Sequence, residues 1–118
     1  MTFTVNLPPP PSVNQSFANA KKGRVKTAAY RSWRDAAAWA IRAQVPSKDR
    51  VAGSFYVAIN LPWNLKGDID NRIKGIVDAL VTSGRVDDDR FMDEIHVCRA
   101  CPTSLAVIVV KPGLKVSA

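Results

Sequence analysis

Acidic residues gather in two short segments of the chain, and these segments could bind a metal ion. The first reads Asp68-Ile69-Asp70-Asn71-Arg72-Ile73-Lys74, and the second is the triplet Asp87-Asp88-Asp89. Carboxylates brought close together repel one another and raise each other's pKa unless a cation lies between them. Mg²⁺ and Mn²⁺ take such oxygen ligands, usually one or two carboxylates together with water and a substrate phosphate. The two segments therefore predict a divalent-metal site.

A metal site of this kind could hydrolyse a phosphodiester. The ion would activate a water molecule, orient the phosphate and stabilise the leaving oxygen. Lys74 follows Asp70 by one helical turn, so its ammonium could stabilise the charge that develops on the phosphate. A simpler interpretation remains open, in which Asp68 caps a helix, Asp70 and Lys74 form a solvated ion pair, and the triplet is an acidic turn.

An amphipathic helix must position the first acidic segment. Its apolar residues recur at helical spacing: Ile69, Ile73, Ile76, Val77, Leu80 and Val81. Gly84 is suited to end this helix. Asp68 and Asp70 are then expected at the helix start, where backbone amides favour negative charge, and Asp70, Lys74 and Asp78 share the opposite face. A following strand beside this helix would bring the triplet alongside Asp68 and Asp70.

The rest of the pattern predicts a small α+β domain. Strands are predicted over residues 2–7, 53–61, 94–100 and 104–110. A second helix is predicted from Thr27, its N-cap, to about Gln44, and residues 12–26 are expected to form a polar, basic loop. Residues 1–118 are thus expected to form a single domain with a small mixed β-sheet and two helices.

Charge favours a polyanionic partner. The 118 residues include 17 Lys and Arg against ten Asp and Glu, a net charge of +7. Eight of the ten acids lie within residues 68–94, which is unusual for a basic protein. Nucleic acid is the first partner that such a charge suits, and an anionic membrane surface is the second. The 47% hydrophobic content excludes a disordered chain, and no apolar run is long enough to span a membrane.

The basic loop expected over residues 12–26 is the candidate DNA-binding element. Its lysines and arginine could simply form a solvated loop, but the net charge of the chain favours contact with phosphates. The aromatic Phe17 could stack on an unpaired base or fold back onto the domain. The candidate contacts are Asn14, Phe17, Lys21, Lys22, Arg24 and Lys26.

The two cysteines predict packing rather than zinc binding or redox chemistry. Cys98 and Cys101 have only His96 nearby, whereas a structural zinc usually takes four ligands. His96 is expected on the less buried face of its strand. Two cysteines cannot build a disulfide framework, and the N-terminus has no signal-peptide pattern, so a cytoplasmic location is expected.

Several motifs recur together in a known family. They are Leu7-Pro8-Pro9-Pro10-Pro11-Ser12 with Asn14, Asp68-Ile69-Asp70-Asn71 with Lys74, Asp78-Ala79-Leu80, Gly84, and the doublet Asp88-Asp89. In this order and spacing, over nearly the whole chain, the sequence resembles the RusA-type Holliday junction resolvases. That resemblance implies an α+β homodimer, dependent on Mg²⁺ or Mn²⁺, that makes paired nicks in four-way DNA junctions during recombination and repair.

The resemblance also implies roles for individual residues. Metal-binding aspartates are implied at Asp68, Asp70 and one member of the triplet, and the active-site lysine at Lys74. Spacing favours Asp89 as the third ligand, with Asp88 as the second choice. The family often has a basic residue directly before the first aspartate. Gly67 stands there in this sequence, and Lys66 precedes it, so a phosphate contact is expected to be moved to Lys66 or lost.

A different class of function remains open. The basic N-terminal half could serve a non-catalytic DNA-binding module of phage or prophage origin, with the acidic residues acting only as caps and turns. A phage regulator acting through protein contacts is a weaker alternative. Metal-dependent nicking of a four-way junction would separate the nuclease from the binding module.

Overall fold

The computed structural model describes residues 2–11, 17–20 and 23–113, with the backbone alone at residues 17–20, 23–26 and 71. The strands are β1 (Phe3–Leu7), β2 (Phe17–Ala20), β3 (Gly23–Lys26), β4 (Phe55–Pro62), β5 (Met92–Cys101) and β6 (Ala106–Pro112). The helices are α2 (Ala28–Gln44) and α3 (Ile73–Ser83), with short 3₁₀ turns η1 (Ser47–Asp49), η2 (Ile69–Arg72) and η3 (Asp89–Phe91). No described helix has both the length and the apolarity needed to cross a bilayer.

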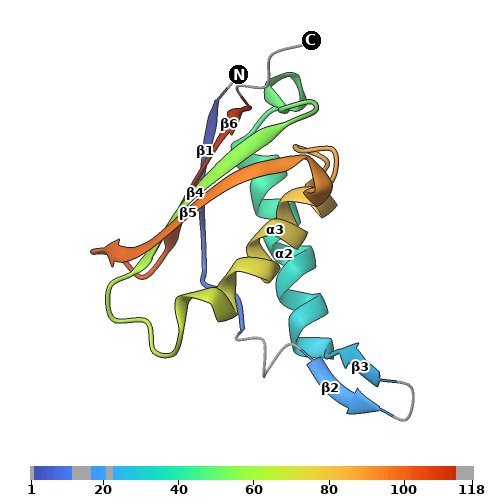
Figure 1. The fold of residues 1–118 in the computed structure, drawn as a ribbon, viewed down its shortest axis with the longest axis vertical. Coiled ribbons are helices and arrows are strands. Elements are labelled where there is room, and N and C mark those ends of the chain that lie inside the picture. The colour runs from blue at the N-terminus through green and yellow to red at the C-terminus, as the bar shows by residue number, and fades with distance from the viewer. Residues whose placement is uncertain (1, 12–16, 21–22, 114–118) are drawn as a thin grey trace.

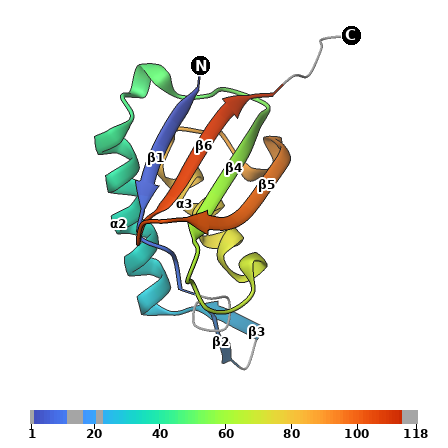
Figure 2. The ribbon, with the colours of Figure 1, turned by 90° about the vertical axis from the view of Figure 1, so that its left-hand side faces the viewer.

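Four strands form a mixed sheet in the order β1-β6-β4-β5. β6 pairs antiparallel with β1 and β4, whereas β4 and β5 pair in parallel. Parallel neighbours need a crossover connection, and α3 provides it between β4 and β5. Both helices lie on the same face of the sheet (Figure 1, Figure 2). The predicted α+β fold with a small mixed sheet and two helices is confirmed.

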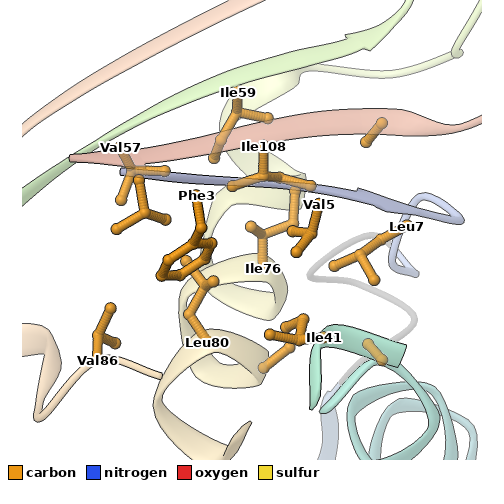
Figure 3. Close-up of a cluster of buried hydrophobic side chains, with 14 of the residues drawn as sticks. Phe3, Val5, Leu7, Ile41, Val57, Ile59, Ile76, Leu80, Val86 and Ile108 are labelled. Atoms are coloured by element: carbon orange, nitrogen blue, oxygen red, sulfur yellow. The ribbon is translucent and has the colours of Figure 1, made fainter. Parts of the chain in front are cut away.

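The core lies between the sheet and the two helices. β1 alternates buried and exposed residues, as its sequence predicts, and β4 alternates buried with half-buried ones. Figure 3 shows the labelled core side chains Phe3, Val5, Leu7, Ile41, Val57, Ile59, Ile76, Leu80, Val86 and Ile108. Ile76 and Leu80 come from α3, so the predicted apolar face of that helix is confirmed and its opposite face is held in a fixed direction.

Residues 12–26 were expected to form a loop, and that prediction is wrong for two of their segments. β2 and β3 pair antiparallel as a hairpin, with Phe17 opposite Lys26 and Ala20 opposite Gly23. The hairpin projects beyond the N-terminal end of α2, away from the four-stranded sheet (Figure 1). Its sequence lacks the apolar alternation that marks a strand packed on a core, because strand pairing alone leaves no such pattern.

The predicted start of the helix that carries the first acidic segment, α3, is also wrong. Residues 69–72 form the 3₁₀ turn η2, and the α-helix begins only at Ile73. Asp68 occupies the position before η2, yet its side chain makes no capping hydrogen bond. Asp and Asn favour turns over helix interiors, which fits a 3₁₀ start at this place. Gly84 ends α3 in the left-handed conformation, with φ of 76°, as predicted.

Candidate active site

A cavity of about 570 Å³ lies along the exposed side of α3. Its walls come from η2 and α3, from η3, and from the first residue of β5. They consist of Asp70, Ile73, Lys74, Val77, Asp78, Asp89, Arg90 and Met92. The structure thus brings together three of the four predicted catalytic residues, namely Asp70, Lys74 and Asp89.

The packing of α3 explains why these side chains face the cavity. Ile76 and Leu80 are fully buried against the sheet, so positions four residues apart on the other side of the helix must face outward. Lys74 and Asp78 follow that spacing, and Asp70 lies in η2, just before the helix begins. The crossover connection then returns the chain to β5, and η3 carries Asp89 to the same cavity.

Asp78 is the residue that the sequence placed on this face without assigning it a role. Its Oδ2 lies 3.6 Å from the Lys74 Nζ, and the Tyr30 hydroxyl donates a hydrogen bond to that same oxygen. Burial, together with the hydrogen bond to Asp78 and the charge of that carboxylate, raises the pKa of Tyr30. Tyr30 lies far from Asp78 in the sequence, and no local pattern could have revealed this contact.

The three aspartates of the triplet have different environments. Asp87 accepts hydrogen bonds from Arg50 and from the Gly53 backbone amide, the latter at 2.8 Å, and these bonds lower its pKa. Asp87 therefore ties the turn to the loop that precedes β4 and lies outside the cavity wall. Asp88 caps η3 by accepting from the Arg90 amide at 3.5 Å.

Asp89 is the member of the triplet that faces the cavity. A hydrogen bond with Asp88 raises the pKa of Asp89, and desolvation and the negative charges of Asp88 and Asp78 act in the same direction. Lys74 opposes this effect with its positive charge. Asp88 instead lines a neighbouring hollow of about 220 Å³, which Asp89 and Asp78 also reach. Asp89 therefore shares the cavity with Asp70 and Lys74, whereas Asp88 does not line it.

The carboxylate oxygens of the cavity wall are the kind of ligand that a hard cation takes. All of its candidate ligands are carboxylates, and a positive ion beside them would favour their ionised form. Among the side chains that the structure describes, no three His, Cys, Asp or Glu residues form a ready-made metal cluster. The predicted ligands Asp68, Asp70, Asp88 and Asp89 are thus not gathered into one such cluster, and Asp70 and Asp89 are the two that line the cavity.

Asp68 does not line this cavity. It is exposed and precedes η2, at the end of a loop that two arginines fix. Arg99 donates to the carbonyls of Leu65 and Gly67 at 3.1 and 2.6 Å, and Arg72 donates to that of Lys66 at 3.2 Å. No sequence pattern indicated that either arginine would have this role.

The predicted DNA contacts fall into three groups. Lys66 is exposed on the fixed loop next to the cavity's η2 wall. The β2–β3 hairpin contains Phe17, Arg24 and Lys26. The remaining candidates lie outside the described residues: Asn14, Lys21 and Lys22.

The cysteines and the histidine lie away from the cavity. Cys101 is buried, as expected of a packing residue, but Cys98 is exposed, so the packing role predicted for Cys98 is wrong. The reason is that β5 is an edge strand, and no described element covers that side of it. Cys98 contacts Asn60 at 3.3 Å, and His96 is exposed as predicted.

Comparison with known proteins identifies one family. The family model described as endodeoxyribonuclease RusA matches residues 6–116. A search of curated proteins found no match. The matched range includes every element that lines the cavity, from η2 to β5.

Proposed function

The chain belongs to the RusA endodeoxyribonuclease family, and we propose that it resolves four-way DNA junctions by metal-dependent, paired nicks. Family membership implies the nuclease activity of a Holliday junction resolvase. The observation that carries the proposal for this chain is the single cavity that Asp70, Lys74 and Asp89 line together. Carboxylates and a lysine in one cavity are what phosphodiester hydrolysis assisted by a metal requires.

Asp70 and Asp89 are the proposed metal ligands, and Asp68 and Asp88 remain candidates beside them. The ion would be Mg²⁺ or Mn²⁺, which, when bound, generates the nucleophile and stabilises the leaving oxygen. The Lys74 ammonium would contact the scissile phosphate and stabilise its developing charge. Asp78 would hold that ammonium in place, since its Oδ2 lies 3.6 Å away.

Binding of the DNA arms would depend on the basic residues outside the cavity. A net charge of +7 attracts a polyanion over the whole molecule. Lys66 would contact a phosphate near the cavity, and the hairpin that carries Arg24 and Lys26 would contact a neighbouring arm. Phe17 would stack on a base left unpaired at the branch point.

A homodimer is proposed because two nicks at a symmetric junction need two sites. The uncovered face of the sheet supports this. Ala58, Val107 and Val109 are half-buried there and line a hollow of about 460 Å³. If this face joins two copies, Val109→Asp should convert the dimer to a monomer in sedimentation. A dimer unaffected by that substitution would place the contact elsewhere.

The experiment that tests the function uses a synthetic four-way junction and a linear duplex of the same sequence. We expect nicks in opposing strands of the junction with Mg²⁺, little cleavage of the duplex, and no cleavage when EDTA removes the metal. A non-catalytic binding module would retard the junction in a gel with strong salt dependence and leave every strand intact. That second result would overturn the nuclease assignment.

A further inference from the structure

We propose that Tyr30 is a positioning residue of this site: its hydroxyl fixes the Asp78 carboxylate, which in turn holds the Lys74 ammonium against the cavity. The proposal rests on the proposed nuclease function of that cavity. Tyr30 is a buried side chain of α2 and does not itself line the cavity, so it would affect the chemical step only through Asp78.

The position of Tyr30 is fixed by its own helix. Its side chain is 1% exposed, and its backbone amide donates to the Thr27 hydroxyl at 3.1 Å in the N-cap of α2. Ring and hydroxyl are therefore held at the place where α2 packs against α3. A buried hydroxyl requires a hydrogen-bond partner, and this one donates to Asp78 on the neighbouring helix.

Asp78 transmits this constraint because one of its oxygens serves two partners. Oδ2 accepts from the Tyr30 hydroxyl and lies 3.6 Å from the Lys74 Nζ. The Asp78 side chain is 18% exposed, whereas that of Lys74 is 53% exposed. A mostly buried carboxylate thus restrains a long and solvated side chain that otherwise has many rotamers open to it.

Loss of the hydroxyl would have two consequences in the cavity. The Asp78 carboxylate could rotate away from Lys74, and the ammonium would then sample positions away from the phosphate. Asp78 also faces the same cavity as Asp70 and Asp89, so a released carboxylate could compete with them for the ion. Both effects slow the chemical step and leave the DNA-binding surface intact.

The test compares Tyr30→Phe with Tyr56→Phe. Each change removes one hydroxyl, but Tyr56 lies in β4 with its ring 5.6 Å from the Lys111 Nζ, and it does not line the cavity. We expect Tyr30→Phe to lower the single-turnover nicking rate at saturating Mg²⁺ by about tenfold, since small misplacements of a catalytic group cost this much or more. Its Kd for the junction should stay within about twofold of the parent's, and Tyr56→Phe should match the parent in both. The Tm of each variant is measured first, and all rates are then compared at a temperature at which every variant is folded.

A double-mutant cycle separates positioning from a general packing role. Asp78→Asn keeps an acceptor for the Tyr30 hydroxyl but removes the charge that holds Lys74, so it should also slow nicking. If Tyr30 acts through Asp78, adding Tyr30→Phe to Asp78→Asn should slow nicking no further. An equal loss in both backgrounds, or a folded Tyr30→Phe variant with the parent's rate, would overturn the positioning role. If the parent protein itself fails to nick, the proposed function falls, and this inference with it.

Discussion

Asp88 and Asp89 are neighbours in one turn, yet their carboxyl groups differ in their tendency to ionise. The pKa of Asp88 is lowered because it accepts hydrogen bonds from Asp89 and from the Arg90 amide. The pKa of Asp89 is raised by the same pairing and by the charges of Asp88 and Asp78. A metal ion beside Asp89 would oppose that rise in pKa, because positive charge favours the ionised carboxylate.

Asp89 lines the cavity and Asp88 does not, and this placement predicts the effects of single substitutions in the triplet. Asp89→Asn should stop nicking, whereas Asp88→Asn should give an intermediate rate because Asp88 orients its neighbour without holding the ion. The measurement is the single-turnover nicking rate of each variant over a range of Mg²⁺ concentrations. An inactive Asp88→Asn together with an active Asp89→Asn would move the ligand by one residue. Full activity in both would reduce the triplet to a turn.

Asp87 has a structural role that can be tested through pH. Its folded-state pKa is lowered, first by Arg50 and then by the Gly53 amide. Its stabilising contribution is therefore present above the unfolded-state pKa of about 4 and is lost as pH falls through the folded-state value. Asp87→Asn should lower the Tm at pH 7, lower it less and less in acid, and leave the nicking rate of the folded protein unchanged. A Tm deficit that does not change with pH would contradict this account.

At the scale of single elements, α3 packs so closely against the N-terminal proline segment that only glycine fits at Gly75. A Cβ at that position would lie 2.9 Å from the Pro10 Cβ and 3.5 Å from the Trp33 ring. Pro10 is buried and its ring is stiff, so the backbone would have to move. Close packing at this point connects the segment after β1 to the helix that lines the cavity.

Gly75→Ala is therefore expected to destabilise the protein. In a free helix interior the change would stabilise by about 1 kcal/mol, but overpacking costs about 1–3 kcal/mol and should dominate. Thr82→Ala, at an exposed position of the same helix, is the matched control and should not destabilise it. Chemical denaturation of both variants provides the measurement. A Gly75→Ala variant more stable than the parent would show that the proline segment yields without cost.

The β2–β3 hairpin should contribute salt-dependent DNA binding. Replacing Lys21, Lys22 and Lys26 together by Ala should weaken junction affinity and flatten its salt dependence. Each lost phosphate contact lowers the slope of log affinity against log salt by about 0.9 on duplex arms. The slope is measured by titrating the junction at several salt concentrations, and an unchanged slope would remove this segment from the DNA-binding surface.

The elements differ in how far the sequence could predict them. The period of Ile73, Ile76 and Leu80 predicted α3 because that pattern records burial against one core. The hairpin has no such apolar pattern, so the loop expected over residues 12–26 was wrong. Ile69 continues the pattern into η2, because a 3₁₀ turn also packs it against the core, so the helix start expected at Asp68 was wrong as well. The shared cavity of Asp70 and Asp89 could be expected from a strand returning beside the helix. The contact of Tyr30 with Asp78 could not, because it depends on how two helices pack.

Across the whole molecule, opposite charges are separated by position in the fold. The parallel pair of β4 and β5 requires a crossover, and the acidic segments lie on either side of α3, which forms it. Three of the ten acidic residues, Asp70, Asp78 and Asp89, thereby line one cavity of a chain whose net charge is +7. Under the proposed function, the basic residues would attract DNA, and the carboxylates of the cavity would repel the phosphate until a cation compensates them. Junction binding and strand cleavage should therefore be separable by a single substitution.

Asp70→Asn provides the most direct test of metal-dependent cleavage at this cavity. The change is nearly isosteric and removes one negative charge, so metal affinity should fall while repulsion within the cavity is relieved. The measurement is single-turnover nicking of a four-way junction at saturating Mg²⁺, with junction affinity and the metal-free Tm determined on the same preparation. We predict no nicking, junction binding equal to or tighter than that of the parent, and a Tm that is no lower. Undiminished nicking by this variant would contradict the assignment of the cavity as the active site.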